Sequence, residues 1–238
     1  MIIGITGSSG AGKSTVCEIL ELNYNVKILN ADKIAKKLSK KGTHYVIDII
    51  KAFGKDIVDE EGELKRKKLA EIIYSDAKAR EKLNDCTFKY IKQEIERQIH
   101  KAPKDTTIVI DAPLLFESEL DKICDKTIGV ISKKELQLDR IVARDNIDYE
   151  SAEKRLEAQK SNAFYKKNCD VIIENNNNYQ HIENSIKKIA EKLEIGRVIK
   201  QWNTGDRFKS VLLLCELWCY CIKLFDSIFE IKRLTYTN

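Results

Sequence analysis

The feature that most constrains the fold is a glycine-rich segment near the start of the chain, residues 7–14, with the sequence GSSGAGKS. It fits the phosphate-binding pattern G-x-x-x-x-G-K-[ST] at every fixed position. Residues 1–6 before it form a short apolar run typical of a buried strand, and Val16, Ile19 and Leu20 after it share one face of a helix. The segment therefore predicts a loop between a strand and a helix, the setting in which this pattern binds phosphate.

The chemistry expected of this loop is the binding of a nucleoside triphosphate. Glycines let backbone amides curl around a polyphosphate, and the start of the following helix adds unpaired N–H groups and the positive end of its dipole. Lys13 would reach the β- and γ-phosphates, and the Ser14 hydroxyl would ligate Mg²⁺. A glycine-rich turn that matches by chance is the alternative, and the agreement of strand, loop and helix argues against it.

Size and charge limit the remaining classes of function. A chain of 238 residues is long enough for one α/β domain, or for a core with a small inserted subdomain. The formal charge of +5 is spread along a lysine-rich sequence without basic clusters interleaved with aromatic residues, so we expect no nucleic-acid partner. The N-terminus leads directly into the predicted first strand without a basic region or cleavage site, which predicts a cytoplasmic protein.

Seven cysteines are scattered along the chain. None forms a C-x-x-C pair, and His44, His100 and His181 lie far from them in the sequence. We therefore expect neither a disulfide framework nor a zinc site, and we interpret the thiols as small apolar side chains in a reducing compartment.

Apolar runs of the strand type recur along the chain, at Ile2–Ile5, Val26–Leu29, Thr107–Ile110, Thr127–Ile131 and Val171–Ile173. The segments between them have helical spacing, as in Lys67–Tyr74 and Leu83–Ile99. Strands that alternate with helices predict an α/β fold, with a parallel sheet of about five strands and helices on both faces.

Two stretches are too long for simple crossovers between strands. Residues 31–101 are helical in pattern throughout, and we expect them to form a helical subdomain over the carboxyl edge of the sheet, where ligands of such folds bind. The charged residues 133–167 interrupt the path to the fifth strand. The core domain would thus span residues 1–200, with an apolar extension over residues 201–238.

Asp32 directly follows the second predicted strand. A carboxylate at the carboxyl end of a neighbouring strand would face the phosphate loop, where it could accept a proton from an acceptor hydroxyl or hold Mg²⁺ through water. Aspartate is also favoured at the cap or first turn of a helix for reasons of the dipole alone. The pattern leaves the two interpretations about even.

Asp111 ends the third predicted strand and begins the segment Asp111–Glu117, which is unusually apolar for a loop. We interpret this segment as a wall against which a flat or apolar part of a ligand rests. Asp111 itself is either a strand-end acid that caps the turn after it or a ligand of the metal, and the sequence leaves this open.

Arg140, Arg144 and Arg155 lie in the charged stretch, and the first two are four residues apart on one helical face. Arginines that clamp a transferring phosphoryl group stabilise its charge. The alternative is a solvated basic face whose partners are nearby acids, the usual fate of such charges.

These pieces together resemble the dephospho-CoA kinase family over about residues 1–195. The most specific parts are P-L-L-F-E at residues 113–117 and Q-x-x-R-x-x-x-R at residues 137–144. Asn30-Ala31-Asp32 is similar to a D-A-D of the family, and Gly62 to Arg66 with Leu69 to G-x-L-D-R-x-x-L. The other matching residues are Leu83 with Asn84, Arg155 with Gln159, and Cys169 to Ile172 with Asn175.

The resemblance implies a P-loop kinase that uses ATP and Mg²⁺ to phosphorylate the ribose 3′-hydroxyl of dephospho-CoA. It implies that Asp32 is the catalytic base, that residues 31–101 bind the acceptor and that residues 133–167 form a lid. The residues that it places at ATP are Gly10, Ala11, Gly12, Lys13, Ser14, Thr15, Arg144 and Asn175, the last near the nucleotide base. Lys13 and Arg140 would act in catalysis, and the acceptor site would include Asp32, Arg66, Leu114, Phe116 and Glu117.

The sequence departs from the family pattern at several positions. Asn30 replaces the first aspartate of D-A-D, and Lys65 replaces an acid. Residues 87–89, Thr-Phe-Lys, stand where the family commonly has a His-Pro pair that helps to line the acceptor site. This last change concerns acceptor affinity more than chemistry, because Asp32, Lys13 and Ser14 are intact.

Two other functions are compatible with the loop. Another P-loop small-molecule or nucleotide kinase would share the ATP site and differ in its acceptor. A nucleotide-dependent switch is suggested by D-x-x-G at residues 59–62, but this match follows no buried strand and no N-K-x-D motif occurs.

The apolar extension beyond residue 200 has no counterpart in the resemblance. Lys209, Glu216, Lys223 and Glu230 recur every seven residues and would make one narrow polar stripe on a helix. Its apolar runs are shorter than the roughly 20 residues that span a bilayer. A helix on the core, an oligomer contact and an interfacial membrane helix all fit, so a membrane contact and the oligomeric state stay open.

Overall fold

The structure, a computed structural model, describes residues 1–176 and 179–196, apart from the side chains of Arg66, Tyr74, Ser75 and Ala77. The expected extension over residues 201–238 lies outside the described residues. In the described part, no helix has the length and apolar character needed to cross a membrane.

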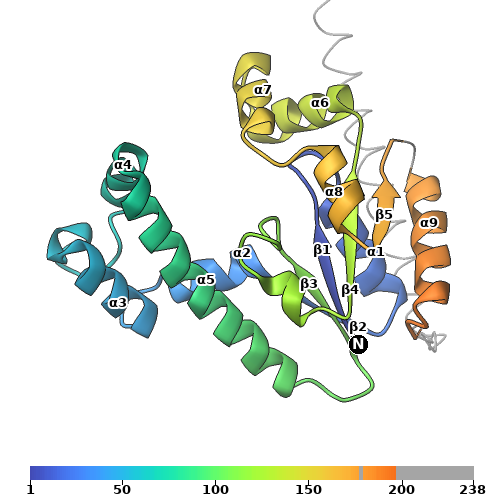
Figure 1. Ribbon diagram of the computed structural model, residues 1–238, viewed down its shortest axis with the longest axis horizontal. Helices are drawn as coiled ribbons and strands as arrows, with labels where there is room; N and C mark the ends of the chain where they lie inside the picture. Colours follow the sequence, from blue (N-terminus) through green and yellow to red (C-terminus); the bar gives the residue numbers. More distant parts are fainter. Residues whose placement is uncertain (177–178, 197–238) are drawn as a thin grey trace, which may run out of the picture. The chain divides into compact units, whose positions relative to one another are not determined.

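Five parallel strands form one sheet in the order β2-β3-β1-β4-β5 (Figure 1). The strands are β1 (Ile2–Thr6), β2 (Val26–Asn30), β3 (Thr107–Asp111), β4 (Lys126–Ile131) and β5 (Val171–Glu174). Each predicted strand is thus confirmed, with ends that differ by one residue. The connection from β1 leads to one side of the sheet and the connection from β3 leads to the other. The two adjacent strands therefore define the switch point at which ligands of such sheets bind.

Helices cover both faces of this sheet, as predicted. The α-helices are α1 (Lys13–Asn23), α2 (Ala31–Leu38), α3 (His44–Phe53), α4 (Arg66–Ser75), α5 (Ala77–His100), α6 (Lys134–Asp145), α7 (Tyr149–Glu157), α8 (Asn162–Asn168) and α9 (Tyr179–Lys192). Two short 3₁₀ segments are η1 (Lys55–Ile57) and η2 (Leu120–Ile123).

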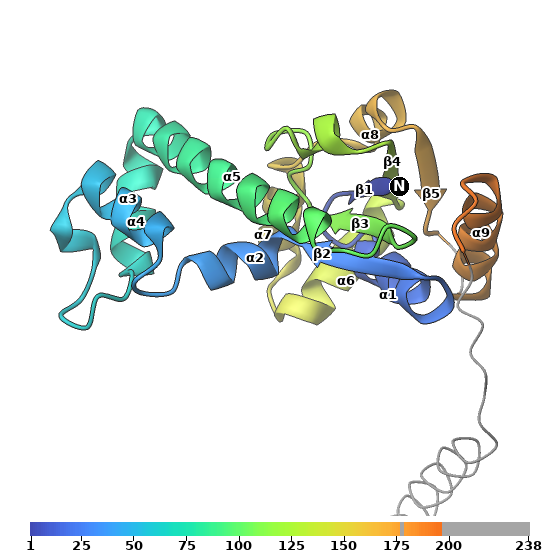
Figure 2. The same cartoon turned by 90° about the horizontal axis from the view of Figure 1, so that it is seen from below.

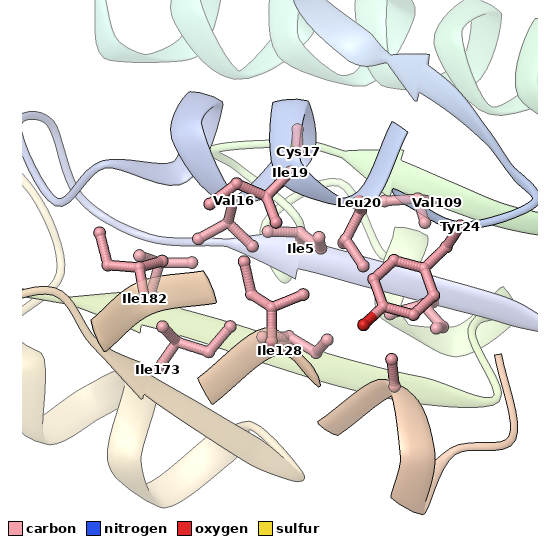
Figure 3. Packing of buried hydrophobic residues seen from close by; sticks show 14 of the residues in the cluster. Ile5, Val16, Cys17, Ile19, Leu20, Tyr24, Val109, Ile128, Ile173 and Ile182 are labelled. Atoms are coloured by element: carbon pink, nitrogen blue, oxygen red, sulfur yellow. The ribbon is translucent and has the colours of Figure 1, made fainter. Parts of the chain in front are cut away.

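One face of the sheet packs against α1 and α9 (Figure 3). Val16, Ile19 and Leu20 of α1, the apolar face expected from their spacing, are all buried there. Cys17 is buried beside them, and burial raises the pKa of its thiol to about 12. This thiol therefore behaves as a small apolar group, as interpreted from the sequence. The packing fixes the start of α1, and with it the phosphate loop, against the sheet.

The opposite face packs against α2 and α5. Ile108 and Ile110 of β3 join this second cluster, whereas Val109 between them joins the first. This alternation is the period of two that a strand requires, and burial on both sides explains why the strand reads as a continuous apolar run. Ile91 and Ile95 anchor the carboxyl-terminal half of α5 in the same cluster.

The helical region expected over residues 31–101 consists of α2 to α5, and α3 and α4 lie at the end of α5 away from the sheet (Figure 2). It has a third apolar cluster, which includes Tyr45, Ile49, Ile57 and Leu69. The D-x-x-G match at residues 59–62 is the turn of an isolated antiparallel bridge between Val58 and Leu64. This turn is far in the sequence from the phosphate loop and follows no strand of the sheet.

Residues 133–167, which were expected to form a lid, hold α6, α7 and most of α8, and α6 and α7 lie beyond the carboxyl ends of the strands (Figure 1). Asn146 ends α6 in the left-handed conformation, with φ of 51°. The Asp148 side chain then accepts a hydrogen bond from the Ser151 amide and begins α7. The short connection keeps α7 in contact with α6, and arginines of both helices line one cavity.

Candidate active site

A cavity of about 740 Å³ opens at the carboxyl edge of the sheet, at the switch point between β1 and β3. Three parts of the sequence that were expected to meet there do so: the phosphate loop, the segment after β3 and the lid. Its polar lining includes Lys13, Ser14, Asp32, Asp111, Glu117, Arg140, Arg144 and Arg155.

The phosphate loop approaches this cavity with its backbone. Gly10 and Gly12 have φ of 74° and 92°, in the left-handed region that favours glycine. Gly12 is the N-cap residue of α1, and no side chain caps this helix. The first N–H groups of α1 are therefore left for a ligand, and the helix dipole favours an anion at this end. The loop thus fits the polyphosphate expected from its sequence.

Lys13 and Asp111 meet across the switch point. The Lys13 ammonium donates a hydrogen bond to the Asp111 carboxylate, and the Asn30 side-chain amide donates to the other carboxylate oxygen. Asp111 is only 4% exposed. The idea that Asp111 caps the turn after β3 is therefore wrong, because both of its carboxylate oxygens face side chains at the mouth of the phosphate loop.

Asp32 lies in the first turn of α2, is exposed and lines the cavity. It does not cap this helix: Asn30 is the N-cap residue, and its side-chain oxygen accepts from the Lys33 amide at 2.7 Å. With the cap supplied by Asn30, the position of Asp32 leaves its carboxylate available to a ligand in the cavity.

The arginines of the charged stretch make two kinds of hydrogen bond, to a carboxylate and to backbone carbonyls. Arg144 makes a bidentate pair with Asp145, at 2.8 and 2.9 Å, and Arg155 donates to the same carboxylate at 2.7 Å. Hydrogen bonding from Arg144 lowers the pKa of the Asp145 carboxyl group, which therefore stays ionised. The expected pairing of basic residues with nearby acids is confirmed for these two arginines, although both still line the cavity.

Arg140 instead donates to backbone oxygens. Its guanidinium contacts the carbonyl of Gly10 at 3.0 Å and that of Asn175 at 3.1 Å. Asn175 is buried, and its side-chain amide donates to the carbonyl of Ala11 at 2.9 Å. These two residues are therefore in contact with the back of the phosphate loop.

The residues expected at the acceptor are less closely grouped. Leu114 and Glu117 line the cavity, and the Leu114 side chain is 51% exposed. The Phe116 ring packs edge-to-face on Phe164, with ring centroids 5.4 Å apart, and does not line this cavity. Arg66 begins α4 in the helical region, and its side chain lies outside the described part.

Sequence reasoning gave no role to three residues that the structure brings to the site. Gln159 accepts a hydrogen bond from the Ser9 amide at 2.7 Å, and Gln137 contacts the loop from α6. Tyr165 lines the cavity, and burial together with Glu117 raises its pKa to about 12, so its hydroxyl stays protonated. A signal for Gln137 was present, because it lies four residues before the buried Ile141 on the inner face of α6.

Residues 87–89 differ from the His-Pro pair that is common in the family, and the structure shows what Thr87 and Lys89 contact. The Thr87 hydroxyl donates to the Leu83 carbonyl at 2.7 Å and contacts the Tyr45 hydroxyl at 3.1 Å. Lys89 places its ammonium 5.7 Å from the centroid of the Tyr90 ring. Thr87 therefore joins α5 to α3 inside the helical region.

The strand order, the phosphate loop between β1 and α1, and the lid arginines above it define a P-loop kinase. Comparison with known proteins narrows the class, since a family model described as dephospho-CoA kinase matches residues 1–181. The chain belongs to the dephospho-CoA kinase family, and the resemblance in sequence is thereby confirmed. This membership assigns it the ATP-dependent phosphorylation of dephospho-CoA to coenzyme A and does not favour another acceptor or a switch.

Individual relatives agree with the family. A dephospho-CoA kinase of Fusobacterium nucleatum is 41% identical over 193 residues, which cover 81% of this chain and 98% of that protein. A dephospho-CoA kinase of Listeria innocua is 35% identical and covers 80% of this chain and 96% of the relative. A solved dephospho-CoA kinase of Campylobacter jejuni is 31% identical, with a TM-score of 0.60 over 81% of this chain and 96% of that one.

Proposed function

We propose that the cavity at the switch point transfers the γ-phosphoryl group of Mg·ATP in line to the ribose 3′-hydroxyl of dephospho-CoA. The observation that supports this proposal is that residues from distant parts of the chain line one cavity. Lys13 and Ser14 of the phosphate loop, the candidate base Asp32 and the lid arginines Arg144 and Arg155 all face it. Donors for a polyphosphate and an acceptor for a hydroxyl proton are thus brought to one place by distant parts of the chain.

The nucleotide end of the cavity supplies positive charge. The ammonium of Lys13 and the guanidinium groups of Arg144 and Arg155 would surround the β- and γ-phosphates, together with the loop amides. Charge that develops on the transferred group is stabilised most by donors that are already in place. The Asp145 carboxylate holds two of these donors in fixed directions.

The oxygen groups near Lys13 fit a magnesium ion. The exposed Ser14 and the buried Asp111 both line the cavity, and Mg²⁺ is bound by hydroxyl and carboxylate oxygens together with phosphate oxygens and water. We propose that Ser14 and Asp111 hold it. When bound, the ion would neutralise charge on the β- and γ-phosphates.

The acceptor end supplies the base. The carboxylate of Asp32 is proposed to orient the 3′-hydroxyl and to take its proton as the new bond to phosphorus forms. Leu114, Glu117 and the protonated hydroxyl of Tyr165 line the same cavity, so an apolar contact and polar contacts would both be available to the acceptor. We propose that α2 to α5 bind the remainder of dephospho-CoA.

The partners in this proposal are the two small-molecule substrates, ATP and dephospho-CoA. The cytoplasmic location expected from the sequence stays a prediction. The oligomeric state and a membrane contact through residues 201–238 concern parts outside the described structure.

The experiment that tests the function is the release of ADP from Mg·ATP with and without dephospho-CoA, with the product identified by mass spectrometry. We expect release that depends on dephospho-CoA and yields coenzyme A. Coenzyme A is the matched control acceptor, because its 3′-hydroxyl already carries a phosphate. A rate of ADP release that is the same with dephospho-CoA, with coenzyme A and with no acceptor would contradict the proposal.

A further inference from the structure

The carbonyl groups of the phosphate loop are bound by side chains from other elements. The Gln137 side-chain amide, on α6, donates to the Ser9 carbonyl at 3.1 Å and to the Ser8 hydroxyl at 2.6 Å. The Asn175 side-chain amide, just after β5, donates to the Ala11 carbonyl at 2.9 Å. Gln137 and Asn175 are 3% and 4% exposed, and neither lines the cavity. Both residues therefore contact the loop on the side away from the ligand.

Two glycines of the loop are packed tightly against these residues. A Cβ atom added at Gly10 would lie 2.5 Å from the carbonyl oxygen of Gln137. One added at Gly12 would lie 1.9 Å from the side-chain nitrogen of Asn175. Glycine is therefore required here for a second reason besides the positive φ, because α6 and Asn175 occupy the space that a side chain would need.

Binding of a carbonyl from one side determines where the following amide points. In a trans peptide the C=O of one residue and the N–H of the next are directed oppositely. With the Ser9 carbonyl directed at Gln137, the N–H of Gly10 points away from α6. With the Ala11 carbonyl directed at Asn175, the N–H of Gly12 points away from Asn175. Gly10 and Gly12 both line the cavity, so these amides are directed to the side where the polyphosphate would lie.

Arg140 connects the two contacts. Its guanidinium donates to the carbonyl of Gly10 at 3.0 Å, to the carbonyl of Asn175 at 3.1 Å and to the Ser132 hydroxyl at 3.2 Å. The Ser132 hydroxyl in turn donates to the Asn175 carbonyl at 2.7 Å. The loop, the end of β4, the end of β5 and α6 thus share one hydrogen-bonded network, in which each buried polar group has a partner.

We infer that Asn175 and Gln137 are positioning residues, which set the direction of the phosphate-loop amides toward the polyphosphate of the nucleotide. Asn175 acts on the loop in this inference, and not on the nucleotide base that the sequence resemblance places near it. The inference rests on the proposed nucleotide site and names the residues that hold that site in its binding conformation.

The test uses two substitutions that keep size and replace the donor by an acceptor, Asn175→Asp and Gln137→Glu, in the full chain. Dissociation constants for Mg·ATP are measured by calorimetry, and Mg·tripolyphosphate, which has no base, is titrated as a competitor. We expect both ligands to bind about tenfold more weakly or worse, by the same factor, because the loop amides lose the contacts that direct them toward the polyphosphate. The KM for dephospho-CoA should stay within about twofold of the wild-type value, since the substitutions leave the acceptor end intact.

Asn23→Asp is the matched control, because the Asn23 side chain also donates to a backbone carbonyl, that of Ile19, but on α1 away from the cavity. It should leave the affinity for both ligands unchanged. Weaker binding of ATP with unchanged binding of tripolyphosphate would show that Asn175 contacts the base and would overturn the inference, as would unchanged binding of both. If Asn175→Asp loses its folded circular dichroism spectrum, Gln137→Glu applies the same test from α6. A wild-type chain that does not bind Mg·ATP would contradict the proposed function instead.

Discussion

The two ends of the cavity differ in how their side chains are held. At the proposed nucleotide end, Lys13 donates a hydrogen bond to the buried Asp111, and Arg140 donates one to the carbonyl of the buried Asn175. At the acceptor end, Asp32 is exposed and the Leu114 side chain is 51% exposed. Hydrogen bonds within the fold thus hold the side chains of the proposed polyphosphate site, whereas the side chains at the proposed acceptor end are exposed. Pre-assembled donors suit electrostatic stabilisation, and an open surface suits a large acceptor.

The difference has a basis in packing. The phosphate loop follows β1, the central strand of a sheet that is covered on both faces. The helical region has an apolar cluster of its own, which includes Ile49 and Ile57. Leu38 of α2 packs against both this cluster and the cluster on the sheet, and α5 contributes residues to both. Substitutions at the two ends should therefore have separable effects.

The largest effect is expected from Asp32→Asn. It should lower kcat by roughly 10²–10⁴-fold, the typical contribution of a positioned base, and leave the affinity for ATP nearly unchanged. Steady-state kinetics with both substrates varied measure this. Glu135→Gln is the matched control, since Glu135 is also an acid in the first turn of a helix, α6. Near-normal turnover in Asp32→Asn would remove Asp32 from the role of base.

Lys13→Met tests the nucleotide end. We expect a loss of about 10²–10³-fold in kcat/KM, because one preorganised donor to the phosphates is removed. We also expect a lower melting temperature, because the buried Asp111 carboxylate loses its cationic partner. The double variant Lys13→Met with Asp111→Asn should regain stability without regaining activity.

Lys27→Met on β2 is the control for the loss of a lysine from the sheet region and should retain activity. A Lys13→Met chain with unchanged melting temperature would show that the contact with Asp111 does not stabilise the fold. The side chains at the nucleotide end would then depend less on their hydrogen bonds than the contrast with the acceptor end implies.

Asp145→Asn tests whether the lid arginines depend on their shared carboxylate. Loss of the charge weakens two pairs at once, so the directions of Arg144 and Arg155 become less fixed. We expect the KM for ATP to rise by about three- to tenfold, corresponding to roughly 1 kcal/mol, with a smaller change in kcat. Asp139→Asn on the outer side of α6, where Asp139 bonds Tyr149, is the control. An unchanged KM for ATP would show that Arg144 and Arg155 do not depend on Asp145. Only the phosphate loop would then be held in place at the nucleotide end.

The smallest effect is expected in the helical region, from Tyr90→Phe. The Tyr90 hydroxyl donates to Asp48 at 2.6 Å, which raises the pKa of Tyr90 to about 12 and lowers the pKa of Asp48. The Asp48 contribution to stability is present above the unfolded pKa and is lost as the pH falls through the lowered value. The Tyr90 contribution is present below the unfolded pKa of about 10 and is lost as the pH rises through the folded value.

The wild-type chain should therefore melt slightly above the Tyr90→Phe variant between about pH 5 and pH 9, and the gap should narrow in acid and in strong alkali. Thermal melts across this range measure the gap, and Tyr179→Phe at an exposed position serves as the control. A difference in melting temperature that does not change with pH would show that the hydrogen bond between Tyr90 and Asp48 does not stabilise the helical region. Activity at pH 7 should stay close to normal in the variant.

Most of the fold could be predicted because its elements have local signals. The apolar runs of β1 to β5 are short and bounded by polar residues, so each was placed to within one residue at its ends. The order of the strands could not be predicted, because parallel pairing joins residues such as Ile3 and Val109 that are far apart in the chain. No local pattern encodes which neighbour a buried parallel strand has.

The site was predictable to the extent that its residues carry charge or belong to the loop motif. Lys13, Ser14, Asp32 and the arginines were named because their chemistry suggests a role on its own. Gln137 and Asn175 were harder, since a neutral amide gives no such signal and their contacts depend on how α6 and β5 are placed around the loop. The family motif contained both residues without indicating which group of the loop each one contacts.

The length of α5 has a mechanical consequence. This helix runs for 24 residues, about 36 Å, from the cluster around Ile49 to the cluster against the sheet that contains Ile95. Its carboxyl-terminal half is a fixed base, and its amino-terminal half is a long arm with α3 and α4 at the end. A tilt of only about 10° at the base would move the far end by roughly 6 Å, given that length. Small rearrangements of packing beside β3 would thus be amplified into a larger displacement of α3 and α4 at the far end of the helix.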